Sequence, residues 1–487
     1  MELMTFGEFL NQLLGRKEIS VSRLTQLTGM KSRNSIQRLL KDESGISLIE
    51  DFRDKLIELE EMAWSVPELE QLNQAVEVSR VGKDLYQARK TMLQIFDHKH
   101  RSSSQSPVGM NPQTQKSISL TRLFETYKSF TKLRILIFDL VPGPFTNELI
   151  KLIRSSPPAF ISISQILYLN KSRSHNAATF VSAFELFNYE HYDVFTLSDD
   201  STEADQINNS LNSIFIDKET AEGDHFTDVI KTDGGDRFTY VSDIPGNSLF
   251  LFNLFHFNRL KREGHNIRKT NEKQDPVSTI ISICEQVIPL ERITGRYIIK
   301  NSFSARMIPP GFFADLMAEA NYFGMDPSHP VIRKLTDLFW ERFHLCYQTD
   351  RPNVCFFTKR GLLDFVTNRV MTDHYYATRP FERAEVEQIL TLALNHLETN
   401  GLFKIYLLKN DYAVGNIEFS YFENKVLWIF DSFSGYGEDY YEAVIDSPPI
   451  IELFDDFIKN ELLPCQTYPE SETIEYLRYL LTLVQAE

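Results

Sequence analysis

The chain has 487 residues, of which 42% are apolar and 24% charged, and its formal net charge is −16. That composition excludes a disordered chain and predicts a folded protein of about two to four domains. No apolar run reaches the ~18 residues that a membrane-spanning helix needs, so the sequence argues against a membrane protein.

Positive charge gathers near the N-terminus of this acidic chain. Residues 14–41 hold a single acid, Glu18, and seven cations: Arg16, Lys17, Arg23, Lys31, Arg33, Arg38 and Lys41. An acidic protein with one basic patch repels a polyanion everywhere except at that patch. The pattern therefore favours a contact with nucleic acid. A solvated basic helix face is the alternative.

Three short helices are predicted in the same region. Thr5 and Glu8 have the spacing of a capping box, which begins the first helix. Ser20 can cap a second helix that ends before Gly29. A third helix is expected over about residues 32–41, with Ile36, Leu39 and Leu40 on its buried face.

The second and third helices resemble the helix-turn-helix of the phage repressor and Cro-type (XRE) family, over residues 4–58. The resemblance is carried by Leu24, by Gly29 five residues later, and by Ile-Gln-Arg-Leu at 36–39, where the family has Ile-x-Arg-Ile/Leu. Two positions depart from the family: Thr25 replaces a small Ala, and Gly29 precedes Ile36 by seven residues instead of six. The resemblance implies a DNA-binding domain over residues 1–58, with the third helix in the major groove.

The polar face of the third helix and the turn before it supply the candidate DNA contacts. Asn and Gln can bond adenine edges, Arg can bond guanine, and Ser and Lys can hold phosphates. We therefore expect eight residues to contact DNA: Lys31, Ser32, Arg33, Asn34, Ser35, Gln37, Arg38 and Lys41. A helical bundle that makes only protein contacts is the alternative.

The next segments connect this region to the rest of the chain. Residues 59–98 follow an amphipathic helical pattern and are predicted to form a helical connector or dimerisation layer, with a self-contained bundle that includes the first helices as the alternative. Residues 99–118 are rich in Ser, Gln and Pro and lack an aliphatic pattern, which predicts a flexible linker.

Residues 119–258 are predicted to form an α/β domain, because strand-like and helix-like runs alternate. Strands are expected at 133–141, 159–169, 192–197, 237–244 and 248–257, and helices at 146–156 and 176–190.

Residues 259–487 are predicted to form a mixed α+β domain. Helices are expected at 276–290, 311–323, 330–348, 380–400, 448–463 and 471–485. Three strands in sequence, at 402–409, 416–423 and 425–431, have the form of an antiparallel meander. No internal repeat stands out at a fixed period.

The sequence offers no catalytic or cofactor signature. GxGxxG, the Walker loop, HExxH and GxSxG are all absent, so we expect no catalytic residue, no cofactor and no enzyme. Cys284, Cys346, Cys355 and Cys465 show no CxxC or His-interleaved spacing, which predicts reduced thiols in a cytoplasmic protein and no metal site.

These patterns together predict a cytoplasmic, bacterial regulator of transcription that binds specific double-stranded DNA. We expect a homodimer, with its interface in helix 66–96 or in the aromatic-rich C-terminal region, and a C-terminal region that senses a small molecule or a protein, or that mediates assembly. Two alternatives stay open. One is a defence-type or nucleic-acid-processing protein with an unrecognised active site in the α/β region. The other is a protein-binding scaffold.

Overall fold

The computed structural model describes residues 3–486, with gaps at 31, 97–107, 112–115, 140–143, 158–159, 185, 188, 190, 199–211, 233–236, 271–275, 310, 313–327, 349, 371–379, 410–416 and 432–440. The chain divides into two compact units. The first comprises Met1–Thr91 and Ser172–Ser174, and the second comprises Met92–Lys171 and His175–Glu487. An N-terminal helical region is thus followed by a mixed α/β region, as expected.

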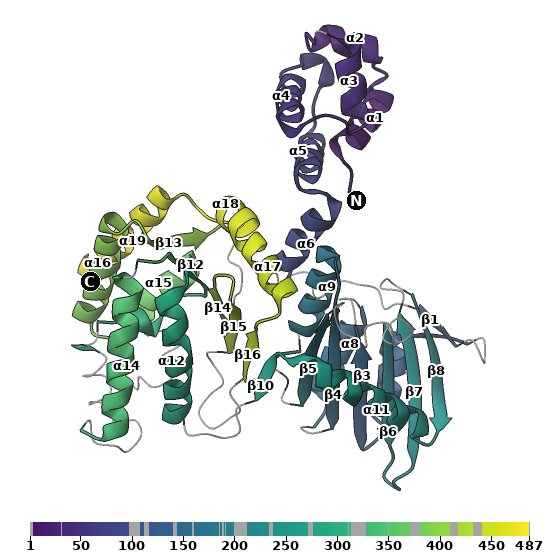
Figure 1. Ribbon diagram of the computed structural model, residues 1–487, viewed down its shortest axis with the longest axis vertical. Coiled ribbons are helices and arrows are strands. Elements are labelled where there is room, and N and C mark those ends of the chain that lie inside the picture. Colours follow the sequence, from purple (N-terminus) through teal and green to yellow (C-terminus); the bar gives the residue numbers. More distant parts are fainter. Residues whose placement is uncertain are drawn as a thin grey trace. The chain divides into compact units, whose positions relative to one another are not determined.

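The first unit is built from short helices. In chain order they are α1 (Phe6–Lys17), α2 (Val21–Leu27), α3 (Arg33–Leu40), α4 (Ile46–Ile57), the 3-10 helix η1 (Glu60–Met62), α5 (Val66–Val81) and α6 (Lys83–Leu93). Figure 1 shows α1 to α5 gathered into one bundle. The predicted capping box is confirmed: Thr5 Oγ1 accepts a hydrogen bond from the Glu8 amide, and the Glu8 carboxylate accepts one from the Thr5 amide.

Helix α5 shares the core of the helices that precede it. Leu72, Ala75 and Val76 of α5 belong to the same buried cluster as Phe6 of α1 and Phe52 of α4. The compact unit therefore extends beyond residue 58, where the sequence placed a boundary.

Two mixed sheets organise the second unit. In the described part of the chain, the first has nine strands in the order β2-β1-β8-β7-β6-β3-β4-β5-β9, and the second has seven in the order β10-β16-β15-β14-β11-β12-β13. The first sheet contains β1 (Val108–Asn111), β2 (Lys116–Ser119), β3 (Lys132–Phe138), β4 (Ile161–Leu169), β5 (Tyr192–Ser198), β6 (Ser213–Glu219), β7 (His225–Thr232), β8 (Arg237–Pro245) and β9 (His265–Asn266). The second contains β10 (Arg268–Thr270), β11 (Arg296–Ile299), β12 (Asn353–Thr358), β13 (Phe403–Leu408), β14 (Ile417–Phe422), β15 (Val426–Asp431) and β16 (Tyr441–Ile445).

The two sheets repeat one arrangement of six strands. In the first sheet β3, β4 and β5 run parallel, and the antiparallel series β6-β7-β8 begins beside β3. In the second sheet β11, β12 and β13 run parallel, and the antiparallel series β14-β15-β16 begins beside β11. We refer to residues 120–266 as the first repeat and to residues 276–486 as the second repeat. A duplication in strand order needs no repeated sequence, which explains why no period was visible.

Helices also accompany the strands of both repeats. They are α7 (Leu120–Tyr127), α8 (Pro144–Ser155), α9 (Arg173–Phe184) and α11 (Ser248–Glu263) in the first repeat. In the second they are α12 (Pro276–Ile293), the 3-10 helix η3 (Ala305–Met307), α14 (Pro330–Tyr347), α15 (Lys359–Asn368), α16 (Arg383–Thr399), α17 (Pro448–Phe457), the π-helix η4 (Ile458–Leu462), α18 (Leu463–Cys465) and α19 (Glu470–Ala486). Figure 1 shows α11 in front of the strands of its sheet and α8 behind them. Helix α11 follows the last strand of the first antiparallel series, and α17, η4, α18 and α19 follow the last strand of the second.

The strand predicted at 248–257 is wrong, because this segment forms helix α11. Its buried residues are Phe250, Asn253, Phe257 and Leu260, at the three- and four-residue spacing of a helix face. A short apolar run fits a buried strand and a buried helix equally well, so the sequence pattern alone did not separate them.

The predicted three-strand meander is also wrong in its first member. Strand β13 pairs in parallel with β12, whereas the antiparallel series is β14-β15-β16. Part of the predicted linker differs as well, because Val108–Asn111 and Lys116–Ser119 pair as strands at the edge of the first sheet. Edge strands form through backbone hydrogen bonds and do not require an apolar pattern. The helix predicted at 311–323 falls almost wholly outside the described residues.

Candidate nucleic-acid interface

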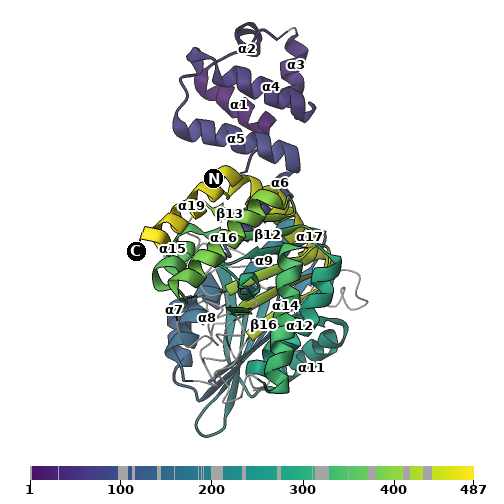
Figure 2. The same ribbon diagram turned by 90° about the vertical axis from the view of Figure 1, so that its left-hand side faces the viewer.

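Helix α3 is held by a buried face and by a polar cap. Ile36 and Leu39 are buried in the core of the first unit together with Leu24 of α2. The Ser20 hydroxyl accepts a hydrogen bond from the Arg23 amide at 3.1 Å, and the Ser32 hydroxyl accepts one from the Asn34 amide at 3.1 Å. Each of the two helices therefore begins at a serine cap, which satisfies an amide that the helix itself leaves unpaired. Figure 2 shows the two helices within the bundle.

The C-terminal end of α3 is fixed to the N-terminal end of α1. Asp42, two residues after the end of α3, accepts hydrogen bonds from the Gly7 amide at 2.8 Å and from Thr5 Oγ1 at 2.5 Å. Asn11 Nδ2 donates to the carbonyl oxygen of Leu40 at 3.0 Å. A Cβ atom at Gly7 would lie 2.6 Å from the carbonyl oxygen of Leu39, so this close approach requires glycine.

The structure brings most of the predicted contact residues onto one exposed face of α3. Five of the eight predicted residues are exposed, two are half-buried, and Lys31 lies outside the described residues. The exposed five are Arg33, Asn34, Gln37, Arg38 and Lys41, and the half-buried two are Ser32 and Ser35. Residues four apart lie on one side of a helix, so Gln37 follows Arg33, and Arg38 follows Asn34.

Two of these residues also have structural roles. Ser32 caps α3, and Arg38 Nη2 donates a hydrogen bond to the carbonyl oxygen of Glu43 at 3.1 Å. In the described part of the chain, the side chains of Arg33, Asn34, Gln37 and Lys41 make no hydrogen bond or ion pair. Their donors and acceptors are available to a ligand.

The cations outside α3 lie near acids that come later in the sequence. Arg16 Nη1 is 3.9 Å and Lys17 Nζ 3.4 Å from the Glu68 carboxylate, and Arg23 Nη2 is 3.9 Å from that of Glu61. Hydrogen bonds from Ser65 and then from Lys17 lower the pKa of Glu68 below its ordinary value, so this acid is ionised. Among the described residues, Arg16, Lys17 and Arg23 are therefore partly neutralised, whereas Arg33, Arg38 and Lys41 form no ion pair.

Sequence reasoning missed the residues that orient α3. Gly7, Asn11 and Asp42 belong to no motif, and Asp42 counts against a basic patch when only charge is considered. Their contacts join residues 29 to 37 positions apart, which no local pattern reveals.

The comparisons with known proteins assign the chain to no family. No protein family model matches the chain, and no curated protein matches it. None of the helices in the described ranges is long and apolar enough to cross a bilayer. The described residues also contain no group of three His, Cys, Asp or Glu side chains placed to hold a metal ion.

Proposed function

We propose that the chain is a sequence-specific DNA-binding regulator of transcription and that α3 reads the DNA. The observation that supports this proposal is the exposed face of α3, where Arg33, Asn34, Gln37 and Lys41 carry unused hydrogen-bonding groups opposite the buried Ile36 and Leu39. These side chains can bond base edges and phosphates, and an α-helix fits the major groove. The rest of the acidic chain repels DNA and orients the encounter.

Two chains are proposed to act together. A single helix reads only a few base pairs, and proteins of this kind gain affinity by binding two half-sites as a symmetric dimer. The second unit is proposed to supply the effector response or the assembly contacts.

Selection of bound DNA from a random duplex library by the full chain tests this proposal. A regulator enriches a defined site, and a dimer enriches a site with two-fold symmetry. Failure to enrich any DNA would contradict DNA binding and favour the scaffold, whereas turnover of the DNA would favour the nucleic-acid-processing alternative. A monomeric mass in light scattering together with an asymmetric site would contradict the dimer.

Paired arginine variants then test the role of α3. Arg33→Ala is expected to weaken binding to the selected site by about 1–3 kcal/mol if Arg33 contacts a base. Arg16→Ala is the matched control, because Arg16 lies near Glu68 and outside α3, and it should change binding much less. Equal losses for both variants would mean that the contact is not confined to α3.

A further inference from the structure

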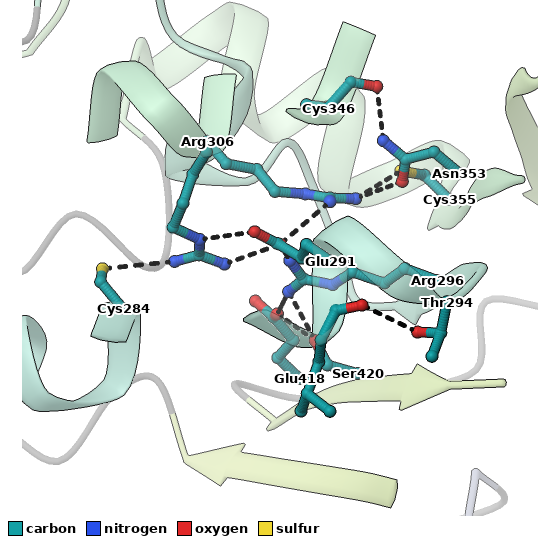
Figure 3. Close-up of polar contacts among 12 residues, drawn as sticks. Cys284, Glu291, Thr294, Arg296, Arg306, Cys346, Asn353, Cys355, Glu418 and Ser420 are labelled. Atoms are coloured by element: carbon teal, nitrogen blue, oxygen red, sulfur yellow. Dashed lines mark hydrogen bonds and ion pairs between the residues drawn. The ribbon is translucent and has the colours of Figure 1, made fainter. Parts of the chain in front are cut away.

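A cluster of buried charges lies in the second repeat, where α12, β11, η3, α14 and β14 meet. We call it the arginine cluster: Glu291, Arg296, Lys300, Arg306, Arg342, Glu418 and Ser420. The Arg296 and Arg306 side chains are 3% and 1% exposed, and that of Arg342 is 12% exposed. Figure 3 shows Arg296 and Arg306 converging on Glu291.

Three guanidinium groups share the carboxylate of Glu291. Arg306 Nη1 lies 3.5 Å and Arg342 Nε 3.4 Å from it, and Arg296 Nη1 is also in contact with it. The two measured distances exceed the ~2.7–2.9 Å of a strong charge-assisted hydrogen bond. One carboxylate thus lies at the centre of three cations and holds at least two of them loosely.

The second carboxylate, that of Glu418, is also shared. Arg296 Nη2 lies 3.4 Å and Lys300 Nζ 3.2 Å from it, and the Ser420 hydroxyl donates a hydrogen bond to it at 2.7 Å. Burial raises the pKa of Glu418, but Lys300 and Arg296 outweigh burial and lower it to about 2. This group is already ionised at neutral pH and has no further negative charge to supply.

Arg306 and Arg342 have no other anionic partner among the described residues. Arg306 Nη2 donates to Asn353 Oδ1 at 2.7 Å and lies 3.7 Å from Cys355 Sγ, and Arg342 Nη1 lies 3.7 Å from Cys284 Sγ. Burial raises the pKa of the Cys355 thiol despite the nearby Arg306, so a thiolate does not provide the missing charge. Burial, followed by repulsion from Arg306 and Arg342, lowers the pKa of Arg296 well below its ordinary value.

Several donors in and beside the arginine cluster are buried without a hydrogen-bond partner. Among the described residues these are Arg296 Nε and Arg306 Nε, and the hydroxyl of Ser302, two residues after Lys300 in the sequence, also lacks a partner. An unpaired buried donor on a charged group destabilises the fold, and an uncompensated buried charge destabilises it more. Within the described part of the chain, the cluster is therefore short of negative charge and of hydrogen-bond acceptors.

We propose that Arg296, Arg306 and Arg342 form a binding site for a small oxyanion, a phosphate or carboxylate group of an effector. Oxyanions supply the acceptors and the negative charge that the cluster lacks, and guanidinium groups bind them through paired N–H donors. The 12% exposure of Arg342 makes it the member of the three nearest to solvent. The site is independent of the proposed DNA contact, so either proposal can fail without the other.

Thermal unfolding of the full chain tests the site in two arms, with increasing inorganic phosphate or increasing citrate at constant ionic strength. The unfolding midpoint should rise with saturation in at least one arm, because a ligand that binds only the folded chain stabilises it. A response to phosphate alone indicates a phosphate group, and a response to citrate alone indicates carboxylates. Absence of a saturable rise in both arms would overturn the proposal.

Variants connect the response to the arginine cluster. Arg342→Gln should weaken anion binding at least ~10-fold, since a charge-assisted pair is lost. Arg360→Gln, in the same repeat, removes a 79% exposed guanidinium next to Asp364 and should leave binding unchanged. If circular dichroism shows that Arg342→Gln does not fold, Arg342→Lys takes its place. This variant keeps the positive charge but lacks the paired N–H donors of a guanidinium group, so it should bind the anion several-fold more weakly than the original chain. Unchanged affinity in the folded Arg342 variant would overturn the proposal.

Discussion

The two repeats of the second unit share one strand order and bury charge in opposite ways. In each, an arginine of the first parallel strand lies against a carboxylate of the adjacent antiparallel strand: Arg134 with Asp217 in the first, and Arg296 with Glu418 in the second. The pair is 2.6 Å apart in the first repeat and 3.4 Å apart in the second. The same strand pair thus carries a close ion pair in one repeat and a loose, shared one in the other.

The charged residues around these two ion pairs also differ between the repeats. In the first repeat the buried Lys218 lies 2.6 Å from Asp228 and 2.6 Å from Asp243, so acids outnumber the cation. In the second repeat three arginines share Glu291. Strand order therefore determines where charged side chains meet, and the sequence decides whether the charges are balanced there. We expect ligand chemistry in the repeat whose cations are in excess.

The largest expected effect comes from removing the shared carboxylate. Glu291→Gln leaves three buried guanidinium groups without their common anion and should destabilise the chain by about 3–5 kcal/mol. Urea unfolding measures the change. Glu285→Gln is the control on the same helix, because Glu285 is half exposed and paired with Lys334 at the surface, and it should cost less than about 1 kcal/mol. Equal costs for the two variants would mean that the arginine cluster is not held by Glu291.

The second variant, Lys218→Met, removes the buried cation of the first repeat. Burial raises the pKa of Asp228 above its ordinary value even though Lys218 lowers it. Just above pH 3.8, the ordinary pKa of an Asp, the folded chain therefore holds the Asp228 proton more often than the unfolded chain does. The contribution of Asp228 to the stability of the folded chain falls as the pH rises from 3.8 through the raised pKa. Lys218→Met removes the cation that lowers the pKa of Asp228. The pKa of Asp228 therefore rises further, and the fall in stability extends to higher pH.

The expected cost of Lys218→Met is about 3 kcal/mol at pH 8, because the buried Asp228 loses its cation, and it is smaller at pH 5, because protonation relieves more of that penalty as the pH falls. Urea unfolding at the two pH values measures both costs. A larger cost at pH 5 than at pH 8 would contradict this account of the first repeat.

The parts of the fold that follow from nearby residues were predictable. Thr5 and Glu8 have the spacing of a capping box over three residues, and the structure contains it. The exposed face of α3 also follows from local spacing, because Ile36 and Leu39 fix which side is buried. Whether that face binds DNA is still a prediction.

What the sequence did not reveal depends on contacts between distant residues. Glu291 and Glu418 are 127 positions apart, yet both contact Arg296. Neither residue belongs to a motif, and the strand that carries Arg296 has only four residues, too few for a periodic pattern. The parallel pairing of β13 with β12 likewise depends on strands separated by helices, so adjacency in sequence suggested the wrong meander.

The next effect concerns Glu418 of the second repeat, whose pKa is shifted in the opposite direction to that of Asp228 in the first repeat. The pKa of Glu418 is lowered to about 2, so its contribution to stability is fully present above its unfolded pKa of 4.5 and is lost as the pH falls toward 2. Glu418→Gln should therefore cost about 2 kcal/mol at pH 7 and clearly less at pH 3.5. Urea midpoints of both proteins measure this difference, in which the cost falls with falling pH, as it does for Lys218→Met. A gap that widens at low pH would contradict the role of Glu418.

The smallest expected effect is the loss of the arginine pair in the first repeat. Arg134 is about one-third exposed, and its partner Asp217 also lies 3.1 Å from His225. Solvent screens such a pair and a second partner remains, so Arg134→Gln should cost only about 1 kcal/mol. Because Arg134 reaches solvent, part of that cost should disappear in 1 M NaCl, whereas the cost of Glu291→Gln, buried in the arginine cluster, should persist. Urea unfolding of both variants at low and high salt measures this contrast. A large, salt-insensitive cost for Arg134→Gln would mean that the first repeat depends on its arginine as strongly as the second depends on Glu291.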